Sequence, residues 1–443
     1  AGPVAAGRSS RGVAGRAPRA PWLAGLLAAA ALLAASSPSM AQARDAAGDG
    51  DDAGPDVSLD LTGYVRSLAG VHDRGFDLPG IDRRSAFNSD VGRLKWSLRW
   101  GEGITVSVHD RLQLRVSSSD GEFGGAEGGS AAGGAGLGVS VVPTRSLDLE
   151  TVLVDDDRVR LWHDIDRLAV TVRTDAADLT IGRQAITWGV AALFPVADLW
   201  ARFSPFELDT EEKPGIDAVR ALAYPGADIE LDLVVADRGS WDDLSAGARA
   251  TVGLASADVY GGFGKFWDRL IAMGGVTRVL DRATLRAEAA VPWSIDDRAF
   301  ERLRATLGID WLASPRLTLT AEYHHNGIGA DDAGGYASRL LDPRVRRGET
   351  YFLGRHYLGG LASWTPDADG RLTLTMSALA NLTDPSAALT PIVSYDLGRR
   401  TRISAGALHS LGDTPAMTAA PPSPQSEFGL YGTLGFIGAS VFF

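Results

Sequence analysis

The sequence contains no cysteine and, after its first 43 residues, no apolar run as long as a transmembrane helix. Without cysteine, no disulfide holds this chain of 443 residues together. A helix that crosses a bilayer needs about 20 largely apolar residues, so a helical membrane protein is excluded for the rest of the chain.

A basic surface is also lacking. The chain has 43 Lys and Arg residues against 55 Asp and Glu residues, a formal net charge of −12. Proteins that bind nucleic acid neutralise its phosphates with a basic surface. We therefore expect no nucleic-acid partner, and the sequence implies no cofactor.

The first 43 residues have the pattern of a secretory signal peptide. Four arginines precede the apolar run from Trp22 to Ala35, and Ala41-Gln42-Ala43 has the small-x-small form that a signal peptidase cleaves. We predict that residues 1–43 direct export and are removed, and that residues 44–56 form a short periplasmic segment. The alternative is an N-terminal membrane anchor.

Most of the remaining chain alternates apolar and polar side chains with a period of two. From Arg93 to Trp100, leucine and tryptophan occupy one face, and arginine, lysine and serine the other. The same pattern recurs in residues 104–116, 284–291, 306–311, 317–324 and 372–378. Strict alternation indicates β-strands with one apolar and one polar face.

The connections between these strands alternate in length. Short turns such as residues 101–103 and 313–315 are followed by long loops, and the longest loops are residues 117–145, 189–216, 326–351 and 412–426. This layout is typical of outer-membrane barrels. We predict an all-β fold over residues 57–443: a single closed antiparallel transmembrane β-barrel of about 18 strands (16–20), with long extracellular loops.

A soluble two-sheet sandwich is the alternative, because its strands also alternate. Aromatic residues near strand ends favour the barrel, since they suit the interfacial girdles of a membrane protein. These residues are Trp96, Trp100, Trp311, Tyr323, Trp364 and Tyr395. A closed barrel also leaves no unpaired sheet edge in lipid.

The final strand ends on an aromatic residue, with Ile437, Ala439, Val441 and Phe443 on one face. Such an ending resembles the signal by which outer-membrane barrels are recognised for assembly. We therefore expect the barrel assembly machinery and outer-membrane lipid as partners, and the outer membrane, reached through the periplasm, as the location. The alternative is an ordinary closing strand of a sandwich.

One region departs from the alternation. It reads G-R-Q-x-I-x-W-G at 182–189, P-x-x-D at 195–198, E-x-x-P-G-x-D-A-V-R at 211–220 and Y-P-G at 224–226. This order resembles the porin-like and alginate-export-like outer-membrane barrels. The resemblance implies that the loop of residues 189–216 folds into or over the lumen and gates or constricts it. The alternative is a merely long surface loop.

Within this predicted constriction, four residues are candidates for solute contact. Arg183 and Arg220 could bind a carboxylate or hydroxyl group bidentately. Trp188 could stack on a sugar ring or anchor the barrel at the membrane interface. Asp198 could contact solute or form a salt bridge that holds the loop.

The polar faces of the N-terminal strands carry many bases. If these faces line the lumen, they form a positive strip that favours anions. The strip consists of Arg93, Lys95, Arg99, Arg111, Arg115 and Arg173. The alternative is simple charge balance against lumenal acids such as Glu230, Asp232, Glu288, Asp310 and Glu322.

We predict an outer-membrane channel, not an enzyme, for small hydrophilic solutes that include anions or saccharides; the oligomeric state stays open. The alternatives are a barrel hydrolase, an export barrel for an anionic polysaccharide, and an assembly or adhesion barrel. No nucleophile or metal motif supports catalysis. The neighbours His109-Asp110, His163-Asp164 and His324-His325 should point to opposite faces of their strands.

Overall fold

The computed structural model describes residues 56–77, 82–119, 144–207, 211–417 and 422–443. The predicted signal peptide and the periplasmic segment up to residue 55 lie outside these ranges, as does most of the predicted loop 117–145. Among the described residues, no helix is both long enough and apolar enough to cross a membrane.

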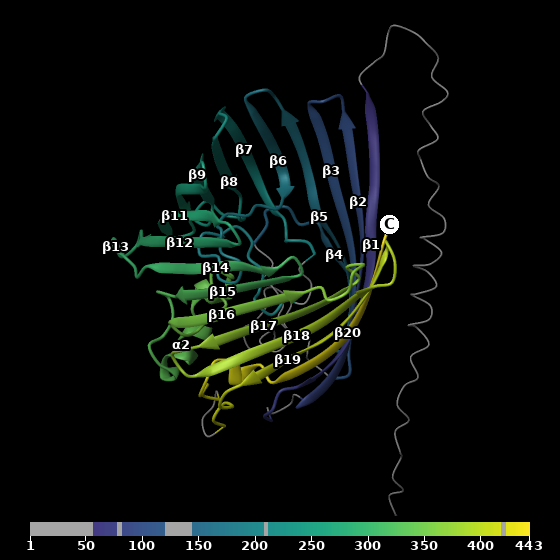
Figure 1. Cartoon of the computed structure of the whole chain (residues 1–443), viewed down its shortest axis with the longest axis vertical. Coiled ribbons are helices and arrows are strands. Elements are labelled where there is room, and N and C mark those ends of the chain that lie inside the picture. The colour runs from purple at the N-terminus through teal and green to yellow at the C-terminus, as the bar shows by residue number, and fades with distance from the viewer. Residues whose placement is uncertain (1–55, 78–81, 120–143, 208–210, 418–421) are drawn as a thin grey trace, which may run out of the picture. The chain divides into compact units, whose positions relative to one another are not determined.

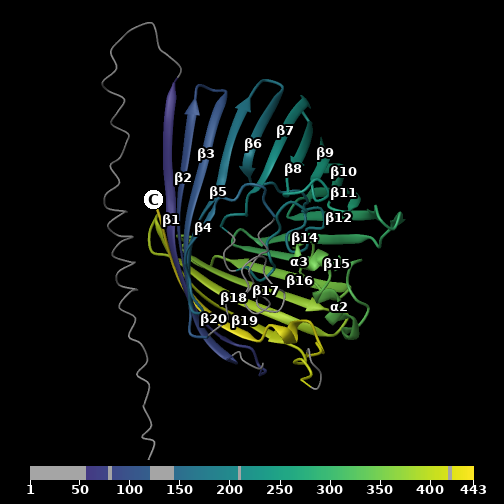
Figure 2. The ribbon, with the colours of Figure 1, turned by 180° about the vertical axis from the view of Figure 1, so that it is seen from behind.

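Eighteen strands form one closed antiparallel barrel, as the alternation predicted (Figures 1 and 2). Each strand pairs with its neighbours in chain order, and β20 pairs with β1 from Tyr64↔Phe442 to Asp73↔Thr433. The strands are β1 (Val57–Asp73), β2 (Arg84–Trp100), β3 (Ile104–Ser117), β5 (Val159–Arg173), β6 (Ala177–Gln184), β7 (Ile216–Gly226), β8 (Ile229–Ala236), β9 (Ser245–Leu254), β10 (Ala257–Phe266), β11 (Arg269–Leu280), β12 (Ala283–Ser294), β14 (Arg304–Ser314), β15 (Leu317–His325), β16 (His356–Trp364), β17 (Leu372–Asn381), β18 (Ser386–Asp396), β19 (Thr401–Leu411) and β20 (Thr433–Phe442). Closure excludes the two-sheet sandwich.

Two further strands lie outside this ring of pairings. Strand β4 (Glu150–Asp155) pairs with β5, and the short β13 (Ala299–Phe300) pairs with the end of β12. All the long connections lie at one end of the barrel, and both the start of β1 and the end of β20 lie at the other, short-turn end.

The outer face of the barrel is apolar. The alternating leucines and tryptophans of β2 lie on it, and Trp100 is 57% exposed. Exposed Trp100, Trp311, Trp364 and Tyr395 all lie toward the short-turn ends of their strands, as an interfacial girdle requires. A water-soluble fold would bury such side chains, so this surface suits the apolar interior of a membrane.

The buried core lies inside the barrel. The described parts of three long connections fold inward: residues 185–207 and 211–215, residues 326–355 with η2 (Ala333–Gly335), α2 (Tyr336–Leu340) and α3 (Pro343–Arg346), and residues 412–417 and 422–432 with η3 (Phe428–Leu430). Their apolar side chains pack on one another and on inward-facing strand residues. These segments occupy part of the lumen.

The inward loop begins earlier than predicted. Strand β6 ends at Gln184, so the loop covers residues 185–215 rather than 189–216. Gly182 has a φ of +118°, and a Cβ there would lie 2.1 Å from the carbonyl oxygen of Leu168. A residue with a side chain cannot adopt this close approach, so the regular strand geometry is interrupted two residues before β6 ends.

Candidate functional site

The loop of residues 185–215, here called the constricting loop, crosses the barrel interior. It leaves β6 and reaches β12 and β15 on the far wall, where its backbone forms hydrogen bonds. Many of its apolar side chains are buried, including Trp188, Phe194, Val196 and Trp200. The loop is therefore a packed part of the interior and not a surface loop.

Two carboxylates of the far wall hold the loop through its backbone. Glu288 of β12 and Glu322 of β15 accept hydrogen bonds from successive N–H groups of the loop at 2.6–3.4 Å. Glu288 binds Val190, Ala191 and Val196, and Glu322 binds Ala192, Leu193 and Phe194. Consecutive N–H groups that converge in this way form an anion-binding nest.

An aromatic contact adds to this attachment. The Phe194 ring stacks on His324 of β15, with centroids 5.2 Å apart and planes 7° apart, and the Thr306 hydroxyl donates to the Phe194 carbonyl at 2.7 Å. A Cβ at Gly359 of β16 would lie 2.6 Å from the Phe194 ring. The wall thus needs glycine at position 359 to let the ring approach.

The first part of the loop packs against β8 to β10. Trp188 contacts Trp200 edge-on at 5.0 Å, and its Nε1 donates to Asp232 of β8 at 2.7 Å. Asp232 also accepts two hydrogen bonds from Arg220 of β7, at 2.8 and 2.9 Å. Trp188 is completely buried, so it anchors the loop and is not accessible for stacking on a sugar.

A buried ion pair ties the two ends of the loop together. The Lys213 Nζ donates to both carboxylate oxygens of Asp198 at 2.7 Å and to the Ile186 carbonyl at 2.7 Å. Burial raises the pKa of the Asp198 carboxyl and lowers that of the Lys213 ammonium, and each partly offsets the shift in the other. Asp198 thus forms a salt bridge with Lys213 within the loop.

Next to the start of the loop, guanidinium groups surround two aspartates of β5. Asp166 accepts from Arg93, Arg145 and Arg167 at 2.6–2.9 Å. Asp164 pairs with Arg111 and Arg145 at 3.0 Å. Asp166 has no partner where β5 pairs with β3, so it forms a β-bulge. Asp166 and Arg167 are both buried.

Arg183 completes this cluster. It is 1% exposed, donates to Asp217 of β7 at 2.8 Å, and its Nη1 lies 3.5 Å from Asp164. Arg183 also donates to the carbonyls of Ile165 and Leu147. Its hydrogen-bonding capacity is used within the protein, so it holds the wall together where β6 ends and does not face the lumen as a free base.

Most bases of the predicted strip have acidic partners. The pairs are Arg93–Asp166, Lys95–Glu212, Arg99–Asp60, Arg111–Asp164 and Arg173–Asp178. Arg115 instead lies over the Trp162 ring, 5.3 Å from its centroid, and no described ion pair includes it. Charge balance is therefore extensive, and the partners are acids other than the five examples given above.

Those five acids have other roles. Glu230 and Asp310 pair with Arg249 and Arg286, while Asp232 binds Arg220 and Trp188. Glu288 and Glu322 hold the constricting loop. Their role was missed because alternation places an acid on the polar face but does not reveal which distant backbone approaches it.

The described residues offer no cluster of metal ligands. None of them form a group of three or more His, Asp or Glu that could hold a metal ion. As predicted, neighbours in strands diverge: His324 stacks on Phe194 inside, whereas His325 lies against His356. Asp110 pairs across strands with His163 at 2.7 Å, and not with His109.

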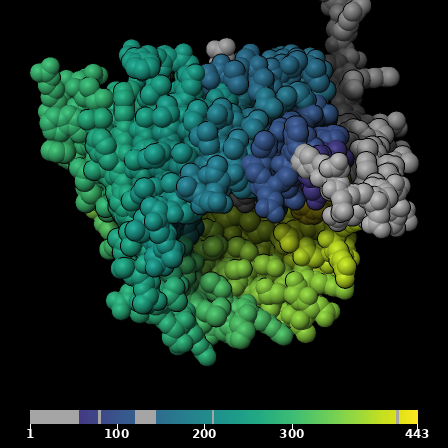
Figure 3. Space-filling model, turned by 90° about the horizontal axis from the view of Figure 1, so that it is seen from above, coloured from purple at the N-terminus to yellow at the C-terminus, as the bar shows by residue number. Residues whose placement is uncertain are grey.

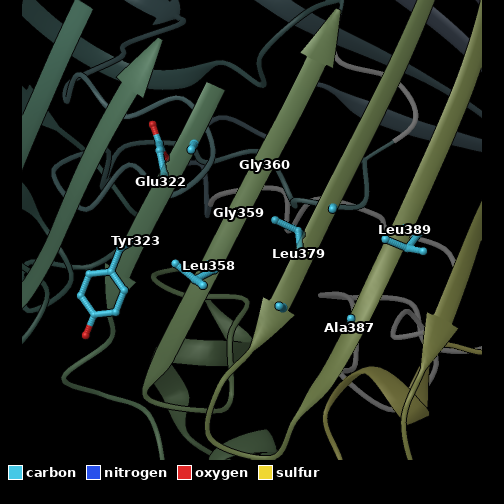
Figure 4. Close-up of a pocket in the computed structure, with 11 residues that line it drawn as sticks. Glu322, Tyr323, Leu358, Gly359, Gly360, Leu379, Ala387 and Leu389 are labelled. Atoms are coloured by element: carbon cyan, nitrogen blue, oxygen red, sulfur yellow. The ribbon is translucent and has the colours of Figure 1, made fainter. Parts of the chain in front are cut away.

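Open space remains beside the loop. Figure 3 shows the molecule hollowed between the strands coloured blue to teal and those coloured green to yellow. A separate groove of about 560 Å³ runs over β15 to β18 and is lined mainly by alanine, glycine, Tyr323, Leu358 and Leu389 (Figure 4). Leu358 is 48% exposed and pairs with Tyr323 on the outer face, so this groove is not part of the lumen.

No protein-family model and no curated protein matches the sequence. Solved structures match the fold: OccAB3 of Acinetobacter baumannii has 11% identity and a TM-score of 0.53, covering 87% of this chain and 99% of that one. OccAB4 of Acinetobacter baumannii has 8% identity, a TM-score of 0.51 and coverage of 87% and 98%. OccD3 (OpdP) of Pseudomonas aeruginosa has 9% identity, a TM-score of 0.50 and coverage of 88% and 92%. This likeness concerns the fold, which is porin-like; the alginate-export-like part of the resemblance stays a prediction.

Proposed function

We propose that the chain forms an outer-membrane channel through which small hydrophilic solutes diffuse. The observation that carries this proposal is a closed barrel of 18 strands with an apolar outer face, a charged interior and a loop that crosses that interior. Barrels of 16–18 strands are wide enough to leave an aqueous passage. The constricting loop then sets the size of solute that can pass.

We further propose that the passage favours anions over cations. Around the start of the constricting loop, the five guanidinium groups of Arg93, Arg111, Arg145, Arg167 and Arg183 face the three carboxylates of Asp164, Asp166 and Asp217. This leaves an excess of two positive charges in the barrel wall at the start of the loop, where Arg111 is the most exposed of the five. Bases that line a pore favour anions, and the extensive ion pairing makes this preference mild.

Conductance in planar bilayers tests the channel, and the reversal potential in a salt gradient tests the ion preference. We expect stepwise conductance and a reversal potential that favours anions. Arg111→Gln should reduce the preference, whereas Arg402→Gln should not, because Arg402 is an exposed base next to a short turn, paired with Asp396. A purified protein that inserts but gives no conductance would contradict the channel, and a reversal potential that favours cations would contradict the anion preference.

Liposome swelling tests the role of the loop. Neutral, anionic and cationic sugars are compared on the wild type and on a variant that lacks residues 190–215. We expect larger sugars to enter through the variant, because its backbone no longer crosses the lumen between β6 and β15. Equal size limits for the two proteins would show that the loop does not constrict the passage.

A further inference from the structure

A buried glutamate joins two of the inward segments to the barrel wall. Glu427 precedes η3 in the connection from β19 to β20 and is fully buried. Its carboxylate accepts hydrogen bonds from the Leu353 N–H at 3.0 Å, the Asn381 Nδ2 at 2.7 Å and the Tyr357 hydroxyl. The Gly354 N–H adds a longer bond at 3.3 Å. One carboxylate thus links residues 412–432 to residues 326–355 and to β16 and β17.

Among the described residues, Glu427 forms no ion pair, so no base neutralises its carboxylate. The titratable groups that face it are Tyr357 of β16, Tyr336 of α2, Asp384 of the turn between β17 and β18, and Tyr431 at the end of η3. Asp384 accepts the Glu427 backbone N–H at 2.6 Å. The other groups near Glu427 are therefore neutral or negative.

Burial of this carboxyl away from any base disfavours its charged form. Burial raises the pKa of Glu427 to about 7, and the nearby Asp384 carboxylate adds to the shift, while the hydrogen bonds from Tyr357, Leu353 and Gly354 oppose it. A released, hydrated Glu427 would have the ordinary pKa of 4.5. Docking of the segment is therefore strongest below pH 4.5, weakens as the pH rises toward 7, and changes little above that.

The same segment supports the constricting loop. Phe428, next to Glu427, contacts Phe206 of the loop with ring centroids 5.9 Å apart, and Tyr431 contacts Phe206 at 4.6 Å. His72 of β1 binds the Tyr431 carbonyl at 2.8 Å. Movement of residues 422–432 would remove the packing that covers one end of the loop.

We propose that Glu427 is a proton-operated latch: while its carboxyl is protonated, residues 422–432 stay docked and hold the constricting loop in place, and ionisation loosens them. The latch rests on the proposed channel function for its effect on transport. The docking equilibrium itself is independent of conduction. Glu427 acts here as a positioning residue, through Phe428 and Tyr431.

The first experiment measures channel conductance between pH 4.5 and pH 8. We expect low conductance in acid and a rise toward pH 7. Glu427→Gln, which cannot ionise, should keep conductance low at every pH. Asp384→Asn should shift the midpoint of the rise to lower pH, because it removes the neighbouring charge; a purely structural role of Asp384 would not move the midpoint. Glu102→Gln, an exposed change in a short turn, should behave as the wild type does.

The second experiment follows docking without relying on conduction. Because the chain has no cysteine, Ser426→Cys places a single thiol in the buried segment, and Ser256→Cys provides an exposed reference at a short turn. The ratio of their maleimide labelling rates corrects for thiol ionisation. We expect this ratio to rise between pH 4.5 and pH 7 by up to about two orders of magnitude, and to stay low when Glu427→Gln is added.

These readouts separate the two proposals. A labelling ratio that does not change with pH, or that changes equally with Glu427→Gln, would overturn the latch even if the protein conducts. A ratio that rises as expected in a protein that never conducts would overturn the channel proposal. The latch would then still control the docking of residues 422–432, without an effect on transport. Heat-modifiable migration in SDS gels verifies that each variant forms the barrel.

Discussion

The two walls that the constricting loop touches differ in how their charged side chains are satisfied. On the near wall, around β5 and β7, charged side chains meet charged side chains, as in Asp166 with its three arginines. On the far wall, Glu288 and Glu322 bind neutral backbone N–H groups. The charges of the near wall are therefore neutralised mostly by other side chains, whereas the two far-wall carboxylates are satisfied mainly by the backbone of the loop.

This difference has consequences for substitution. Removal of one member of a buried ion pair leaves the other charge buried without a partner, which costs about 3–5 kcal/mol. Replacement of a carboxylate that binds N–H groups by its amide leaves only neutral groups and keeps one carbonyl oxygen as their acceptor, so no charge is left buried without a partner. The near wall should thus be the more sensitive to single changes.

The largest effect is expected for Asp166→Asn. Arg93, Arg145 and Arg167 would lose the carboxylate that they share, so we expect the free energy of unfolding to fall by about 3–5 kcal/mol. Urea unfolding in detergent micelles, followed by tryptophan fluorescence, measures the change. Asp60→Asn provides the control, because the Asp60–Arg99 pair is more than half exposed; a similar loss in both variants would contradict the special role of the near wall.

A smaller loss is expected for Lys213→Met, which leaves Asp198 buried without its cation. We expect a loss of about 3 kcal/mol, and the double variant Lys213→Met with Asp198→Asn should recover part of it because no charge stays stranded. The same unfolding assay completes the double-mutant cycle. Additive losses would show that the two side chains do not act as a pair.

Glu322→Gln should affect conduction more than stability. Three N–H groups of residues 192–194 would lose a charged acceptor, so the loop should detach from β15 more often, with larger and noisier conductance. Glu230→Gln makes the same change of charge in the paired Glu230–Arg249 group, away from the far wall. If the two variants conduct alike, the far wall does not position the loop.

Arg115→Gln should have the smallest effect. Arg115 lies over Trp162 and belongs to no described ion pair, so its loss strands no partner and should leave the unfolding free energy nearly unchanged. A slight decrease of anion preference is expected in the reversal potential. A loss of stability as large as that of Asp166→Asn would show that the cation–π contact, and not ion pairing, holds this wall.

Local sequence was sufficient for the barrel because a period of two is a property of each strand alone. The face of β2 that carries Leu94, Trp96 and Leu98 could be identified without knowledge of any other strand. Counting the alternating segments and their turns then led to 18 strands. The departure from alternation after Gly182 marked the loop, and the family resemblance implied that it folds inward.

Local sequence was not sufficient for the site. Arg183, Trp188 and Arg220 lie in or beside the loop, but their side chains are engaged by Asp217 and Asp232, whose contacts depend on the strand register. Glu288 and Glu322 are about 100 or more residues from the amides that they bind, and nothing in their own segments distinguishes them from other acids on the polar face.

By itself, the sequence determined the closed barrel, its apolar exterior and the position of the loop in the chain, because these follow from side-chain periodicity and from the length of connections. Only the tertiary structure decided which lumenal charges neutralise one another, which are used to hold the loop, and that Glu427 is buried without a base. The physical reason is that charge pairing and burial depend on distances between strands and loops that are far apart in the chain.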